Sequence, residues 1–178
     1  MQLQEQATTF LIANSKALRF LSLSGLIFGV CYFFFGLAPG VRLGIIQPFT
    51  AFLASAVTTI INLFGARAWA EGTTVRSSGY SINIAMGCDG IEASSLFLAC
   101  VLAFPTSWRA KLTGLCIGIP LIQVINLARL VALYYAGVHL PSVVEGLHVY
   151  VAQTIVILLS TGLFIFWLER FATEPRRA

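Results

Sequence analysis

One stretch decides how this chain folds: residues 84–105 read IAMGCDGIEASSLFLACVLAFP. A short polar loop with two glycines leads into an apolar helix that ends before Pro105. Cys88 lies where the loop enters the helix. A thiol at a helix start lies near unpaired N–H groups, whose partial positive charge favours the thiolate, the form that attacks carbonyls. Gly87 and Gly90 let backbone or substrate come close. The alternative is a buried cysteine that packs as a small hydrophobic residue.

The composition indicates a membrane protein. Of 178 residues, 58% are hydrophobic and only 10% are charged, whereas soluble domains carry about 25% charged residues. The net charge is +4, but the basic residues flank apolar runs and form no stripe. They therefore indicate membrane topology and not nucleic-acid binding. No repeat or linker divides the chain, so we expect a single domain over residues 1–178.

Long apolar runs predict an all-α membrane protein, a polytopic bundle of about five spanning helices. About 20 apolar residues are enough to cross a bilayer, and we expect spans at about 18–38, 44–64, 90–104, 111–136 and 147–168. The third run is short. Pro120, inside the fourth, predicts a kink.

The segment before the third span predicts a short β-hairpin-like outer loop. Tyr80, Ile82 and Ile84 alternate with small or polar residues, and residues 77–79 have the composition of a turn. A hairpin at this place could cover Cys88 or receive an extended peptide along its edge. Tyr80 is therefore a candidate for substrate contact.

The cations predict the orientation in the membrane, with one conflict. Arg109, Lys111 and the C-terminal arginines place their side in the cytoplasm by the positive-inside rule, so that Cys88 faces outward. Five full spans then place the N-terminus outside, whereas Lys16 and Arg19 favour the inside. A re-entrant or surface-lying segment near the N-terminus would remove the conflict.

The fourth span carries Gln123, Asn126 and Arg129 along one helix face. An arginine inside a span is costly unless it faces the bundle interior or water, so it suggests function, although a snorkelling cation is the alternative. His148 begins the last span on the outer side. A lone histidine there is usually an interfacial anchor, but its imidazole titrates near neutral pH.

Together, Cys88, Arg129 and His148 fit acyl transfer by a cysteine nucleophile. The histidine would take the thiol proton and return it to the leaving amine, and the arginine would stabilise the oxyanion. Asn126 would hold the guanidinium, and Glu145 would orient the imidazole or bind a substrate amine. The four cysteines and two histidines show no metal-ligand spacing, so no metal or other cofactor is expected.

These residues resemble the exosortase/archaeosortase family, most closely its small exosortase H type. The likeness covers about residues 70–168 and is carried by Cys88-Asp-Gly90-Ile91, Leu102-Ala-Phe-Pro105 with Trp108-Arg109, Asn126-Leu-Ala-Arg129 and His148. It implies an intramembrane cysteine transpeptidase of the bacterial inner membrane whose active site faces the periplasm. Its partners would be membrane-anchored proteins with a C-terminal sorting signal of the PEP-CTERM-like kind, which it cleaves and transfers to an acceptor nucleophile.

The resemblance assigns the nucleophile to Cys88, the essential arginine to Arg129 and the histidine to His148, with Gly90 beside the nucleophile. Two other functions remain open from the residues. A non-catalytic membrane adaptor could bind signal helices through the hairpin. A small transporter could be lined by Gln123, Asn126, Arg129 and Gln153, although no repeat symmetry supports it.

Overall fold

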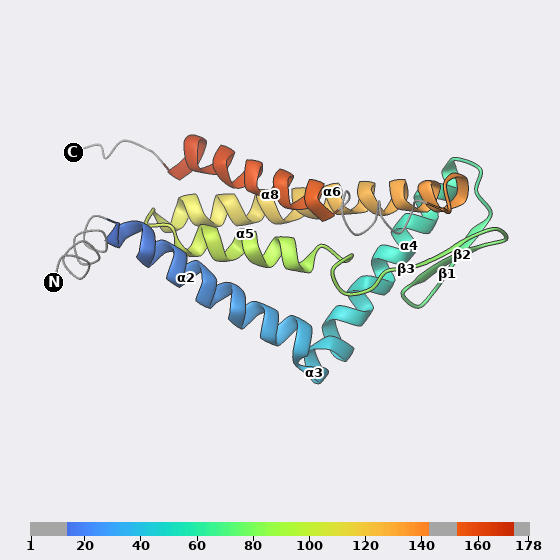
Figure 1. Ribbon diagram of the computed structural model, residues 1–178, viewed down its shortest axis with the longest axis horizontal. Coiled ribbons are helices and arrows are strands. Elements are labelled where there is room, and N and C mark those ends of the chain that lie inside the picture. The colour runs from blue at the N-terminus through green and yellow to red at the C-terminus, as the bar shows by residue number, and fades with distance from the viewer. Residues whose placement is uncertain (1–13, 143–152, 173–178) are drawn as a thin grey trace.

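The computed structural model describes residues 14–142 and 153–172, and these form a helical bundle with a small sheet at one end (Figure 1). The elements in chain order are α2 (Ser15–Tyr32), η1 (Phe33–Leu37), α3 (Pro39–Val41), η2 (Arg42–Ile46), α4 (Gln47–Leu63), β1 (Ala68–Glu71), β2 (Thr74–Ser77), β3 (Ser81–Asn83), α5 (Ile91–Ala103), α6 (Trp108–His139), α8 (Gln153–Trp167) and η4 (Leu168–Ala172). The predicted fold class, an all-α polytopic membrane protein with a hairpin before the third helix, is confirmed.

Among the described residues, four helical stretches are long and apolar enough to cross a membrane. They are Ser15–Leu37, Pro39–Leu63, Trp108–His139 and Thr154–Ala172. The helix that follows Cys88, α5, has only 13 residues, a length of about 20 Å against an apolar bilayer thickness of about 30 Å. Each of the five predicted spans thus contains a helix, but only four helical stretches of the described residues are long enough to span, because α5 is too short to cross the bilayer alone.

The longest helix, α6, is the element against which α4, α5 and α8 pack. Its glycines leave gaps that aromatic side chains fill: a Cβ at Gly114 would overlap Trp167 of α8, and one at Gly118 would overlap Phe97 of α5. Small residues spaced four apart allow close helix packing in membranes. The Trp167 Nε1–H also donates to the carbonyl oxygen of Ala110 at 2.9 Å. These contacts hold α5 and α8 against the first half of α6.

The outer loop forms a three-stranded antiparallel sheet in the order β1-β2-β3. The predicted hairpin is its β2–β3 pair, in which Val75 lies opposite Ile82. The sequence did not predict β1, which pairs with β2. Asn62 holds β1 to the end of α4, because its side-chain amide accepts from the N–H of Ala68 and donates to the Ala68 carbonyl, both at 2.9 Å. The sheet is thereby fixed to α4 as well as to its own turns.

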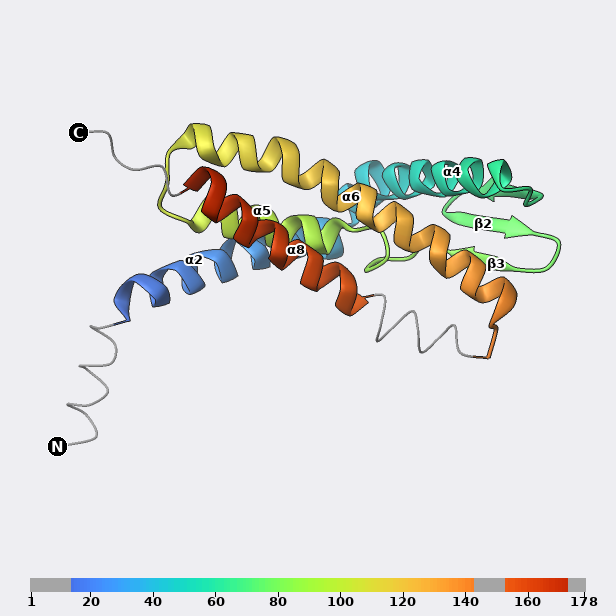
Figure 2. The ribbon, with the colours of Figure 1, turned by 90° about the horizontal axis from the view of Figure 1, so that it is seen from above.

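The first two long helices follow one another along the molecule (Figures 1 and 2). The start of α2 lies beside the end of α5, since the Phe20 and Phe104 rings are 6.2 Å apart. The end of α4 lies beside the second half of α6, where the Tyr135 hydroxyl is 3.5 Å from the Ile61 carbonyl oxygen. Together, α2 and α4 pass once from the end where α5 meets α6 to the end that carries the sheet.

This arrangement bears on the conflict in the predicted topology. The described chain begins and ends at the same end of the bundle, where α5 also connects to α6 (Figure 1). Lys16 and Arg19 at the start of α2 therefore share this end with Arg109 and Lys111. In the structure α2 and α4 advance in the same direction, so the start of α2 and the end of η4 lie at the same end of the bundle (Figures 1 and 2). The orientation of the bundle in a membrane stays a prediction.

Candidate active site

The loop that carries Cys88 is shaped by two glycines and an aspartate. Gly87 has φ 87° and Gly90 has φ 74°, a left-handed conformation that glycine adopts without strain. The Cys88 N–H donates to the Ala85 carbonyl at 2.9 Å and closes a turn. One Asp89 carboxylate oxygen, Oδ1, accepts the N–H of Ile91 at 3.0 Å, where α5 begins. The thiol thus lies in the loop that leads into α5, three residues before the first helical residue, Ile91.

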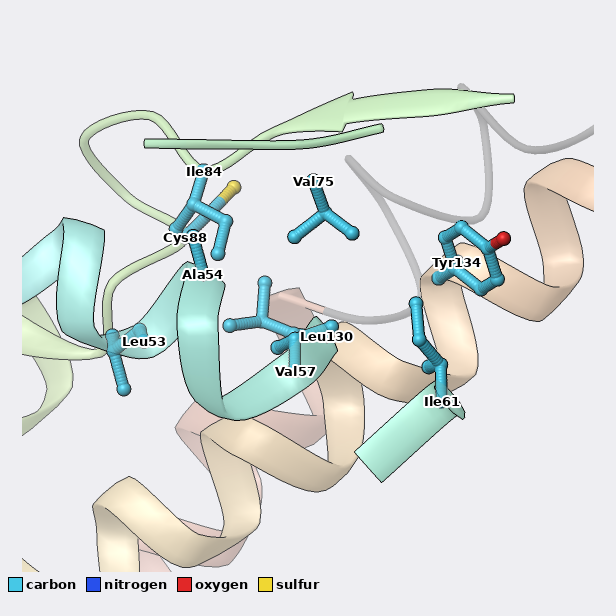
Figure 3. Close-up of a cluster of buried hydrophobic side chains, with 9 residues drawn as sticks. All are labelled: Leu53, Ala54, Val57, Ile61, Val75, Ile84, Cys88, Leu130 and Tyr134. Atoms are coloured by element: carbon cyan, nitrogen blue, oxygen red, sulfur yellow. The ribbon is translucent and has the colours of Figure 1, made fainter. Parts of the chain in front are cut away.

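Cys88 is only 6% exposed and belongs to a buried cluster between α4, α6 and the sheet. Figure 3 shows its sulfur next to Ile84 at the top of this cluster, whose other members are Leu53, Ala54, Val57, Ile61, Val75, Leu130 and Tyr134. The sulfur therefore points into the protein and not toward lipid. A dry environment strengthens any electrostatic interaction that the sulfur makes.

Asn126 and Arg129 of α6 hold the Cys88 segment from the other side. The Asn126 amide Nδ2 donates to the Cys88 carbonyl oxygen at 3.0 Å, and its Oδ1 accepts from an Arg129 terminal nitrogen, Nη1, at 3.2 Å. The other terminal nitrogen, Nη2, donates to the Cys88 sulfur at 3.6 Å. Asn126 is fully buried and Arg129 is 8% exposed. These contacts bring Cys88, Asn126 and Arg129 together, while the predicted roles of Cys88 and Arg129 in catalysis stay predictions.

One donor of this arginine is left over. Arg129 Nε is buried and has no hydrogen-bond partner among residues 14–142 and 153–172. Buried donors are normally satisfied, so an orphaned one needs an explanation. Because it belongs to the guanidinium that contacts the sulfur, it can donate to an oxygen on a group bound beside the thiol.

Opposing influences act on the thiol. Burial raises the pKa of Cys88, while the charge of Arg129 and its hydrogen bond to the sulfur lower this pKa. The negative charges of Asp89 and Glu92 raise it further, and the pKa remains above its ordinary value. The resting thiol is therefore mostly protonated at neutral pH. A nucleophilic role requires that a base take this proton.

The other predicted site residues have different places. Gly90 packs so closely on α6 that a Cβ there would come within 3.0 Å of the Asn126 and Gln123 side chains. Tyr80 packs over Gly137, where a Cβ would overlap its ring, and beside Tyr134 with ring centroids 6.1 Å apart. It fixes the hairpin to the end of α6. His148 and Glu145 lie outside the described residues.

A cavity of about 460 Å³ opens beside the Cys88 loop. It lies between the chain from Asn83 to Asp89 and the start of α4, and its lining includes Arg42, Gln47 and Thr50. Such a volume is typical of ligand sites. Among the described residues, no three His, Cys, Asp or Glu side chains are grouped as metal ligands.

A family model described as transmembrane exosortase matches residues 8–169, nearly the whole of the 178-residue chain. The chain belongs to the transmembrane exosortase family. No curated protein and no solved structure matches it. Family membership confirms the resemblance seen in the sequence and, with the four apolar helices, an integral membrane protein. It supports sorting-signal processing at the level of the family. The likeness to the small exosortase H type stays a prediction.

Two polar residues near the thiol, Asp89 and Gln123, make contacts that their positions in the sequence did not predict. Asp89 is only 2% exposed, although a loop carboxylate is usually solvated, and burial raises its pKa. Gln123 donates from Nε2 to the Ser94 hydroxyl at 3.1 Å and so ties α6 to α5. The signal for Asp89 was its position between the nucleophile and the glycine that precedes the helix.

Proposed function

We propose that this exosortase is a cysteine transpeptidase whose nucleophile is Cys88. The observation that carries the proposal is the buried contact of 3.6 Å between the Arg129 guanidinium and the Cys88 sulfur. A buried arginine needs compensating partners, and here these are a thiol and the amide that also binds the cysteine's own carbonyl. This arrangement suits a thiolate that forms during turnover.

The reaction follows from these groups. A base takes the Cys88 proton, the sulfur bonds to the scissile carbonyl carbon, and the carbonyl π electrons move to oxygen. Arg129 Nε–H, which has no partner in the part of the chain that the structure describes, donates to this oxyanion. The C–N bond then breaks, the amine leaves with the proton from the base, and a thioester remains. An acceptor nucleophile attacks the thioester and releases the thiol. We assign the base to His148, the histidine that the sequence resemblance implies.

The proposed substrates are membrane-anchored proteins with a C-terminal sorting signal, cleaved at the outer face of the bacterial inner membrane. The cationic end of the bundle, with Lys16, Arg19, Arg109 and Lys111, is proposed to face the cytoplasm. The sheet and Cys88 then lie toward the outside. Membrane-impermeant maleimide tests this orientation in intact spheroplasts, by labelling a cysteine introduced at Ser78 in the exposed hairpin turn and not one introduced at Arg109.

The decisive experiment is processing of a tagged exported protein, encoded in the same genome, that ends in a short motif, a spanning helix and a basic tail. Cys88→Ala and Cys88→Ser should abolish its processing while the enzyme still inserts in the membrane. Cys116→Ser is the matched control, because this cysteine is exposed on α6. Normal processing by the Cys88→Ala variant would refute the proposal that Cys88 is the nucleophile and would favour a non-catalytic adaptor.

Arg129→Lys tests the role of the guanidinium. A lysine keeps the charge but cannot contact the sulfur and Asn126 with separate nitrogens while offering Nε–H to an oxyanion. Loss of one oxyanion donor lowers the rate about 10²- to 10³-fold, and we expect a fall of at least this size. For His148→Ala, the acidic limb of the pH profile of processing should disappear. Wild-type rates in Arg129→Lys would contradict the proposed mechanism.

A further inference from the structure

The strand that leads to the nucleophile is an edge strand. In the sheet order β1-β2-β3, β3 has a neighbour on one side only among the described elements. Edge strands attract further strands, and proteins usually protect them. This edge is short, but Ser81 and Asn83 are both exposed. Within residues 14–142 and 153–172, no strand covers this edge where the chain approaches Cys88.

The register of the sheet shows which backbone groups face outward. The Ser77 N–H donates to the Tyr80 carbonyl, and the Ile84 N–H donates to the Thr73 carbonyl, both at 2.9 Å. Val75 and Ile82 lie opposite each other between these two contacts. In an antiparallel pair, the residues that bond across the ladder alternate with residues that point away from it. Tyr80, Ile82 and Ile84 therefore bond to β2.

Ser81 and Asn83 are the alternate residues, so their N–H and C=O groups point away from β2. Outside the β2–β3 ladder, no described backbone group bonds to either of them. Two residues of this kind can exchange up to four hydrogen bonds with an added strand. Such bonds are independent of side chains, and β-strand addition uses them to hold an extended peptide.

The end of β3 lies at the cavity beside the Cys88 loop. Asn83 lines this cavity of about 460 Å³, together with Met86 and Asp89 of the Cys88 loop and Arg42 on the opposite wall. Asp89 is the residue after the nucleophile, and its charge acts on the thiol. A chain paired with Ser81 and Asn83 therefore has space to continue along the Cys88 loop as far as Asp89, the neighbour of the thiol.

We propose that the substrate polypeptide binds as an added strand on the outward edge of β3 and runs from there into the cavity lined by Arg42 and Asp89. This inference rests on the proposed function, because it takes the occupant to be the segment that precedes the cleavage site. The occupant is an extended, unfolded segment of another protein and not a helix or a second copy of this chain. Side-chain specificity belongs to the cavity, while β3 supplies affinity for any extended backbone.

Disulfide trapping tests this in the full-length protein in membranes. Ser81→Cys is placed in a variant with Cys88→Ala and the other three cysteines replaced by alanine, so that bound reporter is not turned over. The reporter is the tagged exported protein described above, with single cysteines scanned through the eight residues before its spanning helix. Ser78→Cys, in the exposed turn of the same hairpin, is the matched control.

We expect disulfide yield to alternate with a period of two along the reporter, at least about threefold between successive positions, because side chains on a strand alternate between its faces. Ser78→Cys should give little product at any position. Yields that vary without alternation, equal yields from Ser78→Cys, or disulfide-linked dimers of this chain as the sole product would overturn the proposal. Since Cys88 is absent, this test reads binding even if the proposed chemistry is wrong.

A second measurement removes one outward donor. Ser81→Pro deletes an N–H that bonds to no residue of β2, and proline is tolerated where an edge N–H faces outward. Ser81→Ala keeps the N–H. We expect Ser81→Pro to raise the reporter concentration for half-maximal processing about fivefold, the loss of one hydrogen bond of ordinary strength, with Ser81→Ala unchanged. Equal values for the two variants, both folded by thermal unfolding, would contradict strand addition.

Discussion

Replacing Asn126 by alanine should lower the reactivity of the Cys88 thiol although the cysteine itself is unchanged. Asn126 is fully buried, and its amide joins the Cys88 carbonyl to the Arg129 guanidinium. Alanine leaves a carbonyl oxygen and a charged N–H without these partners. Each buried group that loses its partner costs about 1–3 kcal/mol, so we expect the free energy of unfolding to fall by about 3 kcal/mol.

The functional consequence reaches the thiol through Arg129. The charge and the hydrogen bond of Arg129 both lower the pKa of Cys88, and they act only while the guanidinium is held against the sulfur. With Asn126→Ala this pKa should rise, and the thiolate fraction at a fixed pH should fall. A change of about 1.4 kcal/mol in that interaction lowers the thiolate fraction about tenfold.

The assay is the rate of Cys88 alkylation by iodoacetamide against pH, in a variant whose other three cysteines are serine. The alkaline midpoint should move upward in Asn126→Ala and in Arg129→Ala, and the double variant should show no larger shift than either, because both act through one contact. Gln123→Ala is the control, since it removes a hydrogen bond to Ser94 from the same helix face. An unchanged midpoint in Asn126→Ala, or additive shifts in the double variant, would refute this reasoning.

Two further predictions concern stability. Burial raises the pKa of Asp89, so its ionised form is disfavoured in the folded protein. Asp89→Asn should therefore stabilise by about 1 kcal/mol at pH 7.5, and this gain should shrink as pH falls below the raised pKa toward that of a free carboxyl. The measurement is the Tm of the variant minus that of the wild type at pH 7.5 and at pH 4.5. Gly118→Ala should destabilise by about 1–3 kcal/mol, because its Cβ would overlap the Phe97 ring. Gly29→Ala, with nothing within 4 Å of its Cβ, should leave Tm unchanged or raise it.

Much of the helical fold was predictable because the membrane imposes a simple rule on sequence. Apolar runs of about 20 residues mark spans, and the observed Trp108–His139 helix contains the run expected at 111–136. The rule fixes lengths but not directions. Nothing in the runs themselves shows that the first two helices follow one another along the molecule (Figures 1 and 2). That arrangement depends on packing between segments distant in sequence, such as Phe20 against Phe104.

The pairing of Asn126 with Arg129 was predictable from helix periodicity, while the sheet that packs beside Cys88 was predictable only in part. Asn126 and Arg129 lie three residues apart and so share a face, and an arginine inside an apolar span must find partners. The same logic does not place β1, because Ala68–Glu71 is short and lacks an alternating apolar pattern. Its position depends on Asn62, whose two hydrogen bonds to Ala68 form only after α4 is in place.

The arrangement of α6 explains how a polar site can exist in so apolar a protein. Its glycines at positions 114, 118 and 137 receive aromatic rings from α8, α5 and the hairpin, so the packing that replaces lipid contact lies on either side of the polar face. Asn126 and Arg129 lie between these glycines along α6, where they are shielded from lipid and donate hydrogen bonds to the Cys88 segment. Because α5 is too short to cross the bilayer, its start, and with it the thiol loop, ends within reach of that face. A longer α5 would carry the loop past Arg129, so the short length of the helix that follows the nucleophile keeps the thiol beside the guanidinium.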